Sequence, residues 1–374
     1  CTSTLICESE FTLCISNNGD VYSFGRDNRG SHGHEEEHVL HPTKIEMLQN
    51  IKSISCGYQH SVCADEHGSV FTFGTNENGE LGIGQEKDIL PFTYQPQKVN
   101  VPLVKQAVCG GDFSFCLTDN GDVYGFGDNK YGQLGIGITS SHVTSPQKLV
   151  DLANVEFLDC GGYHTICKTK DNDVYSWGYN IEGQLGTGGN DKKKSPFKVT
   201  TWPDNIIDIK CGGFHTLILT SNNEVYSCGY NNRMQLGRPC KEGITEATMR
   251  KIEGLSEIIR IECGYYYSVC INVHQDIYIF GDNRYGQLGL GDTENRDKPM
   301  KHPILSNVID ISSGGNHIFV KCLPNEIYAF GRNTYGQLGM ETENENQASP
   351  IQTFQDNSDI WHSTIKSRAK SARK

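Results

Sequence analysis

Residues 160–186, CGGYHTICKTKDNDVYSWGYNIEGQLG, carry the pattern that decides the fold. A Cys-Gly-Gly-Tyr-His word at 160–164 is followed, 18 residues after its cysteine, by the glycine that closes Val-Tyr-Ser-Trp-Gly at 174–178. Variants of both words recur seven times with the same internal spacing. The copies open at Cys7, Cys56, Cys109, Cys160, Cys211, Cys263 and Ser313, and they close at Gly25, Gly74, Gly127, Gly178, Gly229, Gly281 and Gly331.

Each copy predicts four short β-strands. In the fourth copy, 155–159 is an apolar run, and 164–169 alternates up to the turn signal at 171–173. Residues 174–177 are β-branched and aromatic, and 197–200 follows a loop that contains glycine. No segment longer than a turn has convincing helical periodicity.

A four-stranded unit of about 50 residues cannot bury its own faces, and radial repetition solves that problem. The sequence therefore predicts an all-β, seven-bladed β-propeller over residues 1–355. An open solenoid is the alternative, but neither end carries a polar capping repeat. The strands expected at 4–7 and 351–354 could pair with each other and close the ring.

Composition limits the function. The chain is 36% hydrophobic with a formal net charge of −12, so we expect protein partners with basic faces and no nucleic-acid binding by the ring. No run approaches 18 apolar residues and no signal peptide is visible, so no membrane association is expected. Fifteen cysteines, an odd number, favour free thiols in the cytoplasm or nucleus.

Residues 356–374 differ from the ring in charge. Five basic residues against Asp356 and Asp359 give the segment +3, which leaves −15 for residues 1–355. We interpret it as a basic C-terminal tail or linker, and a nuclear signal and a disordered end are the alternatives.

The repeated residues are explained by packing rather than by chemistry. The glycines fit turns and no phosphate-loop motif. The cysteines recur in register without any Cys-x-x-Cys pair, which favours small side chains near a crowded axis over metal or disulfide. The four equivalent histidines alternate with Phe11, Phe113 and Tyr267, so we expect hydrogen bonds between blades from His60, His164, His215 and His317. We predict no catalytic residue, no metal and no cofactor.

The first copy carries one unusual loop, because Gly30-Ser31-His32-Gly33 replaces the Gly-Gln-Leu-Gly of other copies. Around it cluster His34, residues 35–37, His38 and His41. A solvated acidic loop is the favoured interpretation, and a metal site is the alternative.

One face of the ring is the predicted partner-binding site. The two residues before each histidine position fall in a tight turn, and seven such turns emerge together around the channel. Directly before the histidine position, the seven copies carry Glu10, Gln59, Asp112, Tyr163, Phe214, Tyr266 and Asn316. Tyr58 and Tyr265 lie one residue earlier in their copies. Tyr163, Phe214 and Tyr266 come from consecutive copies and should form an aromatic arc, as an interface hot spot would. Rings folded inward over the channel are the alternative.

Several words in the chain resemble repeats of the RCC1 (regulator of chromosome condensation) family: Tyr131-Gly-Gln-Leu-Gly135, Tyr285-Gly-Gln-Leu-Gly289 and Tyr335-Gly-Gln-Leu-Gly339. The resemblance spans roughly residues 1–355 and implies the propeller fold. It implies several functions, since the family includes Ran exchange factors, ubiquitin-ligase modules, a plant ultraviolet receptor and scaffolds.

Departures from the family narrow these functions. Asp112 matches an acidic position of the Ran exchange factor, but that protein's inserted β-wedge is missing after Gly127, and Tyr163 stands where it has Asp. The plant receptor's Gly-Trp-Arg-His-Thr turns are also absent. We therefore expect a monomeric, non-enzymatic protein-binding ring that regulates a small GTPase, in the manner of a guanine-nucleotide exchange factor. The alternative is an adaptor or substrate-recognition module of a larger ubiquitin-ligase or BTB-type protein.

Overall fold

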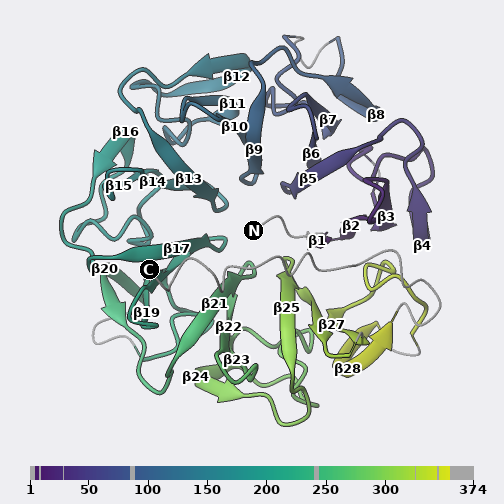
Figure 1. Cartoon of the computed structure of the whole chain (residues 1–374), viewed down its shortest axis with the longest axis vertical. Helices are drawn as coiled ribbons and strands as arrows, with labels where there is room; N and C mark the ends of the chain where they lie inside the picture. Colours follow the sequence, from purple (N-terminus) through teal and green to yellow (C-terminus); the bar gives the residue numbers. More distant parts are fainter. Residues whose placement is uncertain are drawn as a thin grey trace, which may run out of the picture.

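The computed structural model describes residues 5–7, 10–27, 29–84, 89–239, 244–324, 326–342 and 345–353, so the predicted basic tail at 356–374 lies outside the described residues. They form a closed ring of seven antiparallel sheets around a central channel (Figure 1). Each sheet holds four consecutive strands of the chain. The chain is thus an all-β seven-bladed propeller, as its repeats predicted. No helix in the described ranges is long and apolar enough to cross a bilayer.

The strands occupy four radial positions, from the channel outward. The innermost strands are β1 (Leu5–Cys7), β5 (Ile51–Cys56), β9 (Val104–Cys109), β13 (Val155–Cys160), β17 (Ile206–Cys211), β21 (Ile258–Cys263) and β25 (Val308–Ser313). The second strands are β2 (Phe11–Ile15), β6 (His60–Asp65), β10 (Phe113–Thr118), β14 (His164–Thr169), β18 (His215–Thr220), β22 (Tyr267–Asn272) and β26 (His317–Cys322). The third strands are β3 (Val21–Arg26), β7 (Val70–Thr75), β11 (Val123–Asn129), β15 (Val174–Gly178), β19 (Val225–Tyr230), β23 (Ile277–Gly281) and β27 (Glu326–Arg332). The outer strands are β4 (His38–Lys44), β8 (Phe92–Lys98), β12 (Ser140–Lys148), β16 (Lys193–Lys198), β20 (Thr245–Lys251), β24 (Arg296–Lys301) and β28 (Asn346–Thr353).

The closing glycine of each copy has a steric cause. It pairs with the histidine position of the second strand, as in His215↔Gly229. Gly229 has φ +107°, and a Cβ there would lie 2.5 Å from the carbonyl oxygen of Phe214. Only glycine fits such a conformation without strain. The constant spacing between the two sequence motifs therefore reflects the register in which the second and third strands pair.

Apolar side chains fill the space between blades rather than within them. Seven buried clusters correspond to the seven blade interfaces. The one between the third and fourth blades includes Phe115, Leu134 and Trp177, all fully buried. A single blade would expose half of each cluster, which is why the fold needs the complete ring.

The equivalent histidines connect neighbouring blades, as predicted. Their Nε2 atoms lie 2.8–3.1 Å from a hydroxyl of the next blade, in the pairs His60–Ser114, His164–Thr216, His215–Ser268 and His317–Thr12. Burial lowers the pKa of each of these histidines to about 3, so the rings are neutral. Tyr267 takes the same position and donates its hydroxyl to the carbonyl of His317 in the next blade at 2.7 Å.

The structure corrects two expectations. The chain ends do not pair, because β1 is hydrogen-bonded to β2 and β28 to β27. The ring closes by packing instead: Leu5 and Phe24 of the first blade share a core cluster with Phe319 of the last. The outer strand of the fourth blade runs from Lys193 to Lys198 rather than over 197–200, because Gly178 pairs with Lys193 across a bulge.

Candidate functional site

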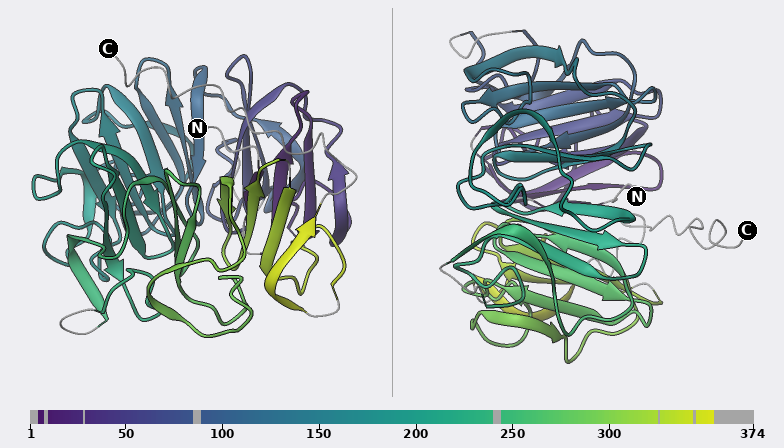
Figure 2. Two further views of the ribbon diagram at one scale, coloured as in Figure 1. Left: turned by 60° about the horizontal axis from the view of Figure 1, so that its bottom comes forward. Right: turned by 90° about the vertical axis from the view of Figure 1, so that its left-hand side faces the viewer.

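The Cys-Gly-x-x-His turns, which join the first and second strands, lie at one face of the ring, here called the turn face (Figure 2). In every blade the carbonyl of the residue before the histidine position accepts the N–H of the residue after the closing glycine, at 2.8–2.9 Å. The pairs are Glu10–Arg26, Gln59–Thr75, Asp112–Asp128, Tyr163–Tyr179, Phe214–Tyr230, Tyr266–Asp282 and Asn316–Arg332. Each blade therefore presents two side chains side by side.

A chain of backbone hydrogen bonds holds the turn tips against one another. Each bond runs from the N–H of one blade to a carbonyl of the next, at 2.8–3.3 Å. The series is Tyr58→Gly111, Gly111→Gly162, Gly162→Gly213, Gly213→Tyr265 and Tyr265→Gly315. The channel mouth is thereby fixed, and the side chains on it are presented by rigid backbone.

Tyr58 and Tyr265 fold inward and cap the channel. Their hydroxyls are 3.0 Å apart, although the two residues are 207 positions apart in the sequence. Glycines make room for them, since a Cβ at Gly111 would lie 2.6 Å from the Tyr58 ring and one at Gly162 2.4 Å from its hydroxyl. For these two tyrosines the inward alternative is the one that the structure supports.

Tyr163, Phe214 and Tyr266 form the predicted aromatic arc. The rings of Tyr163 and Phe214 are 5.9 Å apart, and those of Phe214 and Tyr266 are 6.3 Å apart and stacked. All three side chains are half-buried. Tyr265 joins the arc to the cap, with its ring 4.5 Å from that of Tyr266.

The sequence analysis missed Tyr131, Tyr179 and Tyr230, which extend the arc. Tyr131 lies 5.5 Å from Tyr163, and Tyr230 lies 6.0 Å from Tyr266. Tyr179 and Tyr230 directly follow closing glycines, and this repeated position was the available signal. The ammonium group of Lys192 lies 4.7 Å from the centre of the Tyr131 ring, so the extended aromatic arc already binds one cation from the same chain.

Glu10, Gln59 and Asp112 lie around a cavity of about 340 Å³, which Tyr58, Arg26 and Asp27 also line. The structure thus brings these three predicted residues together beside the cap. Burial, with a smaller contribution from the negative charge of Asp128, raises the pKa of Asp112 to about 6, while Lys130 opposes the shift. The cavity is acidic at neutral pH, which suits a basic group of a partner.

Glu80 is a second missed residue of this acidic sector. It stands where Gln133 and Gln287 stand in other blades, and its side chain accepts the N–H of Asn78 at 2.6 Å. Burial raises the pKa of Glu80 to about 8, with a smaller contribution from Asp112. A glutamate in a position built for an amide is therefore protonated at neutral pH.

Asn316 lies apart from both the arc and the acidic cavity. Its backbone partner Arg332 takes part in a series of cation–π contacts between arginines and tyrosines. The Arg332 guanidinium lies 5.4 Å from the centre of the Tyr285 ring and 4.8 Å from that of Tyr335, which Arg26 also covers at 4.8 Å. Around the channel, the turn face thus has an aromatic, an arginine–tyrosine and an acidic sector.

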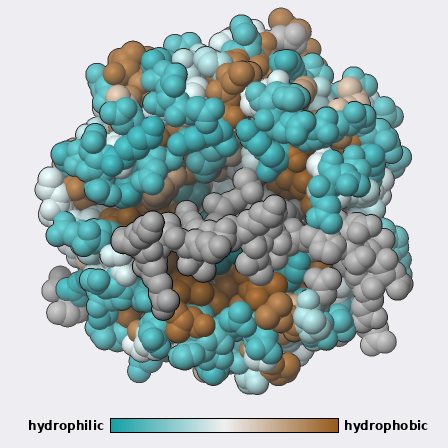
Figure 3. All heavy atoms as spheres, viewed as in Figure 1, coloured by the Kyte–Doolittle hydropathy of each residue, from teal (hydrophilic) through white to brown (hydrophobic). Residues whose placement is uncertain are grey.

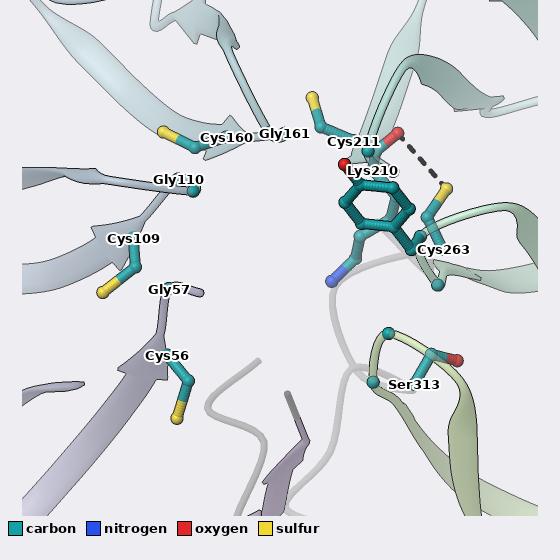
Figure 4. A pocket seen from close by; sticks show the side chains of 18 of the residues that line it. Cys56, Gly57, Cys109, Gly110, Cys160, Gly161, Lys210, Cys211, Cys263 and Ser313 are labelled. Carbon is teal, nitrogen blue, oxygen red and sulfur yellow. Dashed lines mark hydrogen bonds between the residues drawn. The ribbon is translucent and has the colours of Figure 1, made fainter. Parts of the chain in front are cut away.

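Beneath the cap, the first cysteine of the second to sixth copies lines the channel near the axis, as predicted (Figure 4). A cavity of about 190 Å³ is lined by Cys56, Cys109, Cys160, Cys211 and Cys263, with Ser313 in the seventh blade. Every cysteine whose side chain the structure describes is a free thiol. Lys210 also lines the cavity and forms an ion pair with Glu262 at 3.0 Å.

The unusual loop of the first blade is solvated over only part of its length, whereas the sequence predicted a solvated loop throughout. Residues 35–38 are exposed, but His32 is fully buried in the position that leucine holds in other blades. Its Nδ1 accepts the backbone N–H of His34 at 3.3 Å, and burial lowers the pKa of both rings. Within the described residues, no group of three or more His, Cys, Asp or Glu side chains could hold a metal ion.

Comparisons with known proteins agree with this architecture. The profile of the RCC1-like domain matches residues 2–204, and that of the regulator of chromosome condensation (RCC1) repeat matches 222–271, 275–320 and 325–364. The chain belongs to the family of RCC1-repeat propellers. It is 31% identical to the ultraviolet-B receptor UVR8 of Arabidopsis thaliana over 321 residues, which cover 83% of this chain and 71% of the receptor.

Two further comparisons show how widely the fold is used. The chain is 30% identical to the mouse E3 ubiquitin-protein ligase HERC2 over 82% of its own length, but it spans only 7% of that protein. The crystal structure of Prp20p from Saccharomyces cerevisiae, a protein described by its binding to Gsp1p and histones, superposes with a TM-score of 0.76 at 19% identity. It covers 93% of this chain and 86% of Prp20p, and it supports the fold alone.

Proposed function

We propose that this chain is a non-enzymatic protein-binding ring whose partner docks on the turn face. The observation that supports it best is the arc of half-buried aromatic rings, from Tyr131 through Tyr163 and Phe214 to Tyr266. Tyrosines and arginines on rigid backbone are the typical anchors of protein interfaces. The other blades carry polar side chains at the same turn position, so the fold itself does not require these rings.

We further propose that the partner is a small GTPase whose nucleotide release is accelerated. The acidic cavity around Asp112 motivates this choice, because carboxylates near a bound nucleotide compete with its phosphates for Mg²⁺ and lysine. Prp20p, which shares the propeller fold, is described as binding Gsp1p.

Release of a fluorescent GDP analogue from a panel of small GTPases, Ran included, tests the proposal. We expect one GTPase to be accelerated, with at least a tenfold loss in Asp112→Ala and in Phe214→Ala. Glu66→Ser, on the opposite face, is the control and should change nothing. The acceleration should also decline as the pH falls through about 6, since Asp112 then becomes protonated.

An adaptor role is the second candidate, favoured by the similarity to a small part of HERC2. It predicts no acceleration with any GTPase, while Phe214→Ala weakens binding of whichever protein docks on the arc. If Phe214→Ala loses binding and no exchange activity is found, the result would support the turn face as the binding site and contradict the exchange-factor proposal.

A further inference from the structure

The face opposite the turn face, where the inner strands begin, differs between the two halves of the ring at identical repeat positions. The second residue of the inner strand is charged in blades two to four, at Lys52, Lys105 and Glu156. In blades five to seven it is isoleucine, at 207, 259 and 309. Since the same fold accepts charge at these positions, the isoleucines are not a requirement of blade packing.

The turn between the second and third strands shows a similar division, except that blade five carries Ser221 there. Its first residue is Glu66, Asp119 and Lys170 in blades two to four, but Val273 and Leu323 in the last two blades. Ile207, Ile259, Val273, Ile304 and Leu323 have exposed fractions of 45%, 51%, 42%, 69% and 45%. These five side chains are called the apolar patch below.

Backbone hydrogen bonds hold the segments of the patch together. The N–H of Val273 donates to Glu257 at 3.0 Å, and that of Leu323 to Asn307 at 3.0 Å. The two blades are joined by a bond from Val308 to Gln275 at 2.9 Å. Figure 3 shows this face, with a hydrophobic area just below the centre, over the blades of β21 and β25. A contiguous exposed apolar surface is typical of an interaction site.

The C-terminal segment starts at the edge of this patch. Thr353, the last residue of β28, pairs with Ile327, which lies four residues after Leu323. The segment that follows contains Phe354, Ile360, Trp361 and Ile365. The eight residues that follow Thr353, up to Trp361, span up to about 28 Å when extended, so these side chains can reach the inner blade ends.

Charge complements the apolar contact. Beyond Ile365 the chain carries five basic residues at Lys366, Arg368, Lys370, Arg373 and Lys374. The patch is bordered by the exposed acids Asp204, Glu253 and Glu257. We propose that residues 354–374 of this chain dock on the apolar patch through Phe354, Ile360, Trp361 and Ile365, with the basic run against these carboxylates.

Hydrogen exchange of the full chain, followed by mass spectrometry on peptides from 354–365, tests the proposal. We expect exchange at least tenfold slower in the unmodified protein than in the double variant Ile259→Ser/Leu323→Ser. Lys52→Ser/Glu66→Ser alters the same two repeat positions on the second blade and should leave the protection unchanged. Exchange at the rate of a free peptide in the unmodified protein would overturn the proposal.

Two more measurements separate other occupants of the patch. Trp177 and Trp202 are 0% and 8% exposed, so quenching by acrylamide should report on Trp361 and should increase in the patch variant. Light scattering after size exclusion should give a monomer for every variant. A dimer that Ile259→Ser/Leu323→Ser dissociates would mean that a second copy covers the patch, and the proposal would fail.

Discussion

Two neighbouring residues of each turn have opposite roles: the histidine position is buried in the interior, and the residue before it lies at the surface. The histidine position holds His, Phe or Tyr, always buried, and in five blades its polar atom bonds to the next blade. One residue earlier the seven blades carry Glu, Gln, Asp, Tyr, Phe, Tyr and Asn, all at least partly exposed. A repeat protein can therefore keep its stability in one layer while it varies its recognition in the neighbouring one.

The strongest test of this division is Gly229→Ala in the buried layer. The positive φ and the 2.5 Å approach to the Phe214 carbonyl should lower the free energy of unfolding by about 3 kcal/mol or more. Urea titration measures the change. A Cβ added at Gly189 would meet no heavy atom within 4 Å, so Gly189→Ala is the matched control and should shift stability by less than about 0.5 kcal/mol.

The next effect should come from His215→Ala, which removes a buried ring and its bond to Ser268. We expect a loss of about 2–3 kcal/mol, mostly from the cavity. That loss applies at pH 8 and should shrink by about 2 kcal/mol towards pH 5, because the pKa of about 3 keeps the folded ring neutral while the unfolded histidine, with its ordinary pKa of 6.5, takes up a proton. A loss that is the same at pH 5 and pH 8 would contradict a histidine that stays neutral in the folded state.

Glu80→Gln is expected to stabilise the protein. The folded-state pKa of about 8 is raised above the ordinary value of 4.5, so the protonated form contributes stability at low pH that is lost as the pH rises through 8. The variant should therefore gain on the order of 2 kcal/mol at pH 8.5 and little at pH 5. Melting temperatures of both proteins across this range provide the measurement, and an equal gain at both pH values would exclude a titrating Glu80.

The smallest effect belongs to the surface layer. Tyr58→Phe removes the hydroxyl that meets Tyr265 and should lower stability by only about 0.5–1 kcal/mol, because both rings stay packed over the glycines. Tyr265→Phe should give the same loss, and the double variant should add nothing further. Additive losses in a double-mutant cycle would show that the two hydroxyls do not depend on each other.

The repeat made the interior predictable and left much of the surface unpredicted. Seven equivalent words determined the blade number, the closing glycines and the role of His215 without any structure. A periodic sequence shows which positions are equivalent but not how far apart side chains lie across the channel. The contact between Tyr58 and Tyr265 could therefore not be predicted. Tyr179 was missed because its neighbour Tyr163 is 16 residues away, and only the strand register brings them together.

Closure without a strand shared between the first and last blades has a consequence for how such rings arise. Because each blade is one unbroken stretch of chain, a gene duplication or deletion of about 50 codons adds or removes a whole blade and splits none. The junction between the last and first blades uses the same imidazole–hydroxyl contact, His317 to Thr12, as the junctions inside the chain. A circular permutant opened between any two blades should consequently assemble into the same wheel.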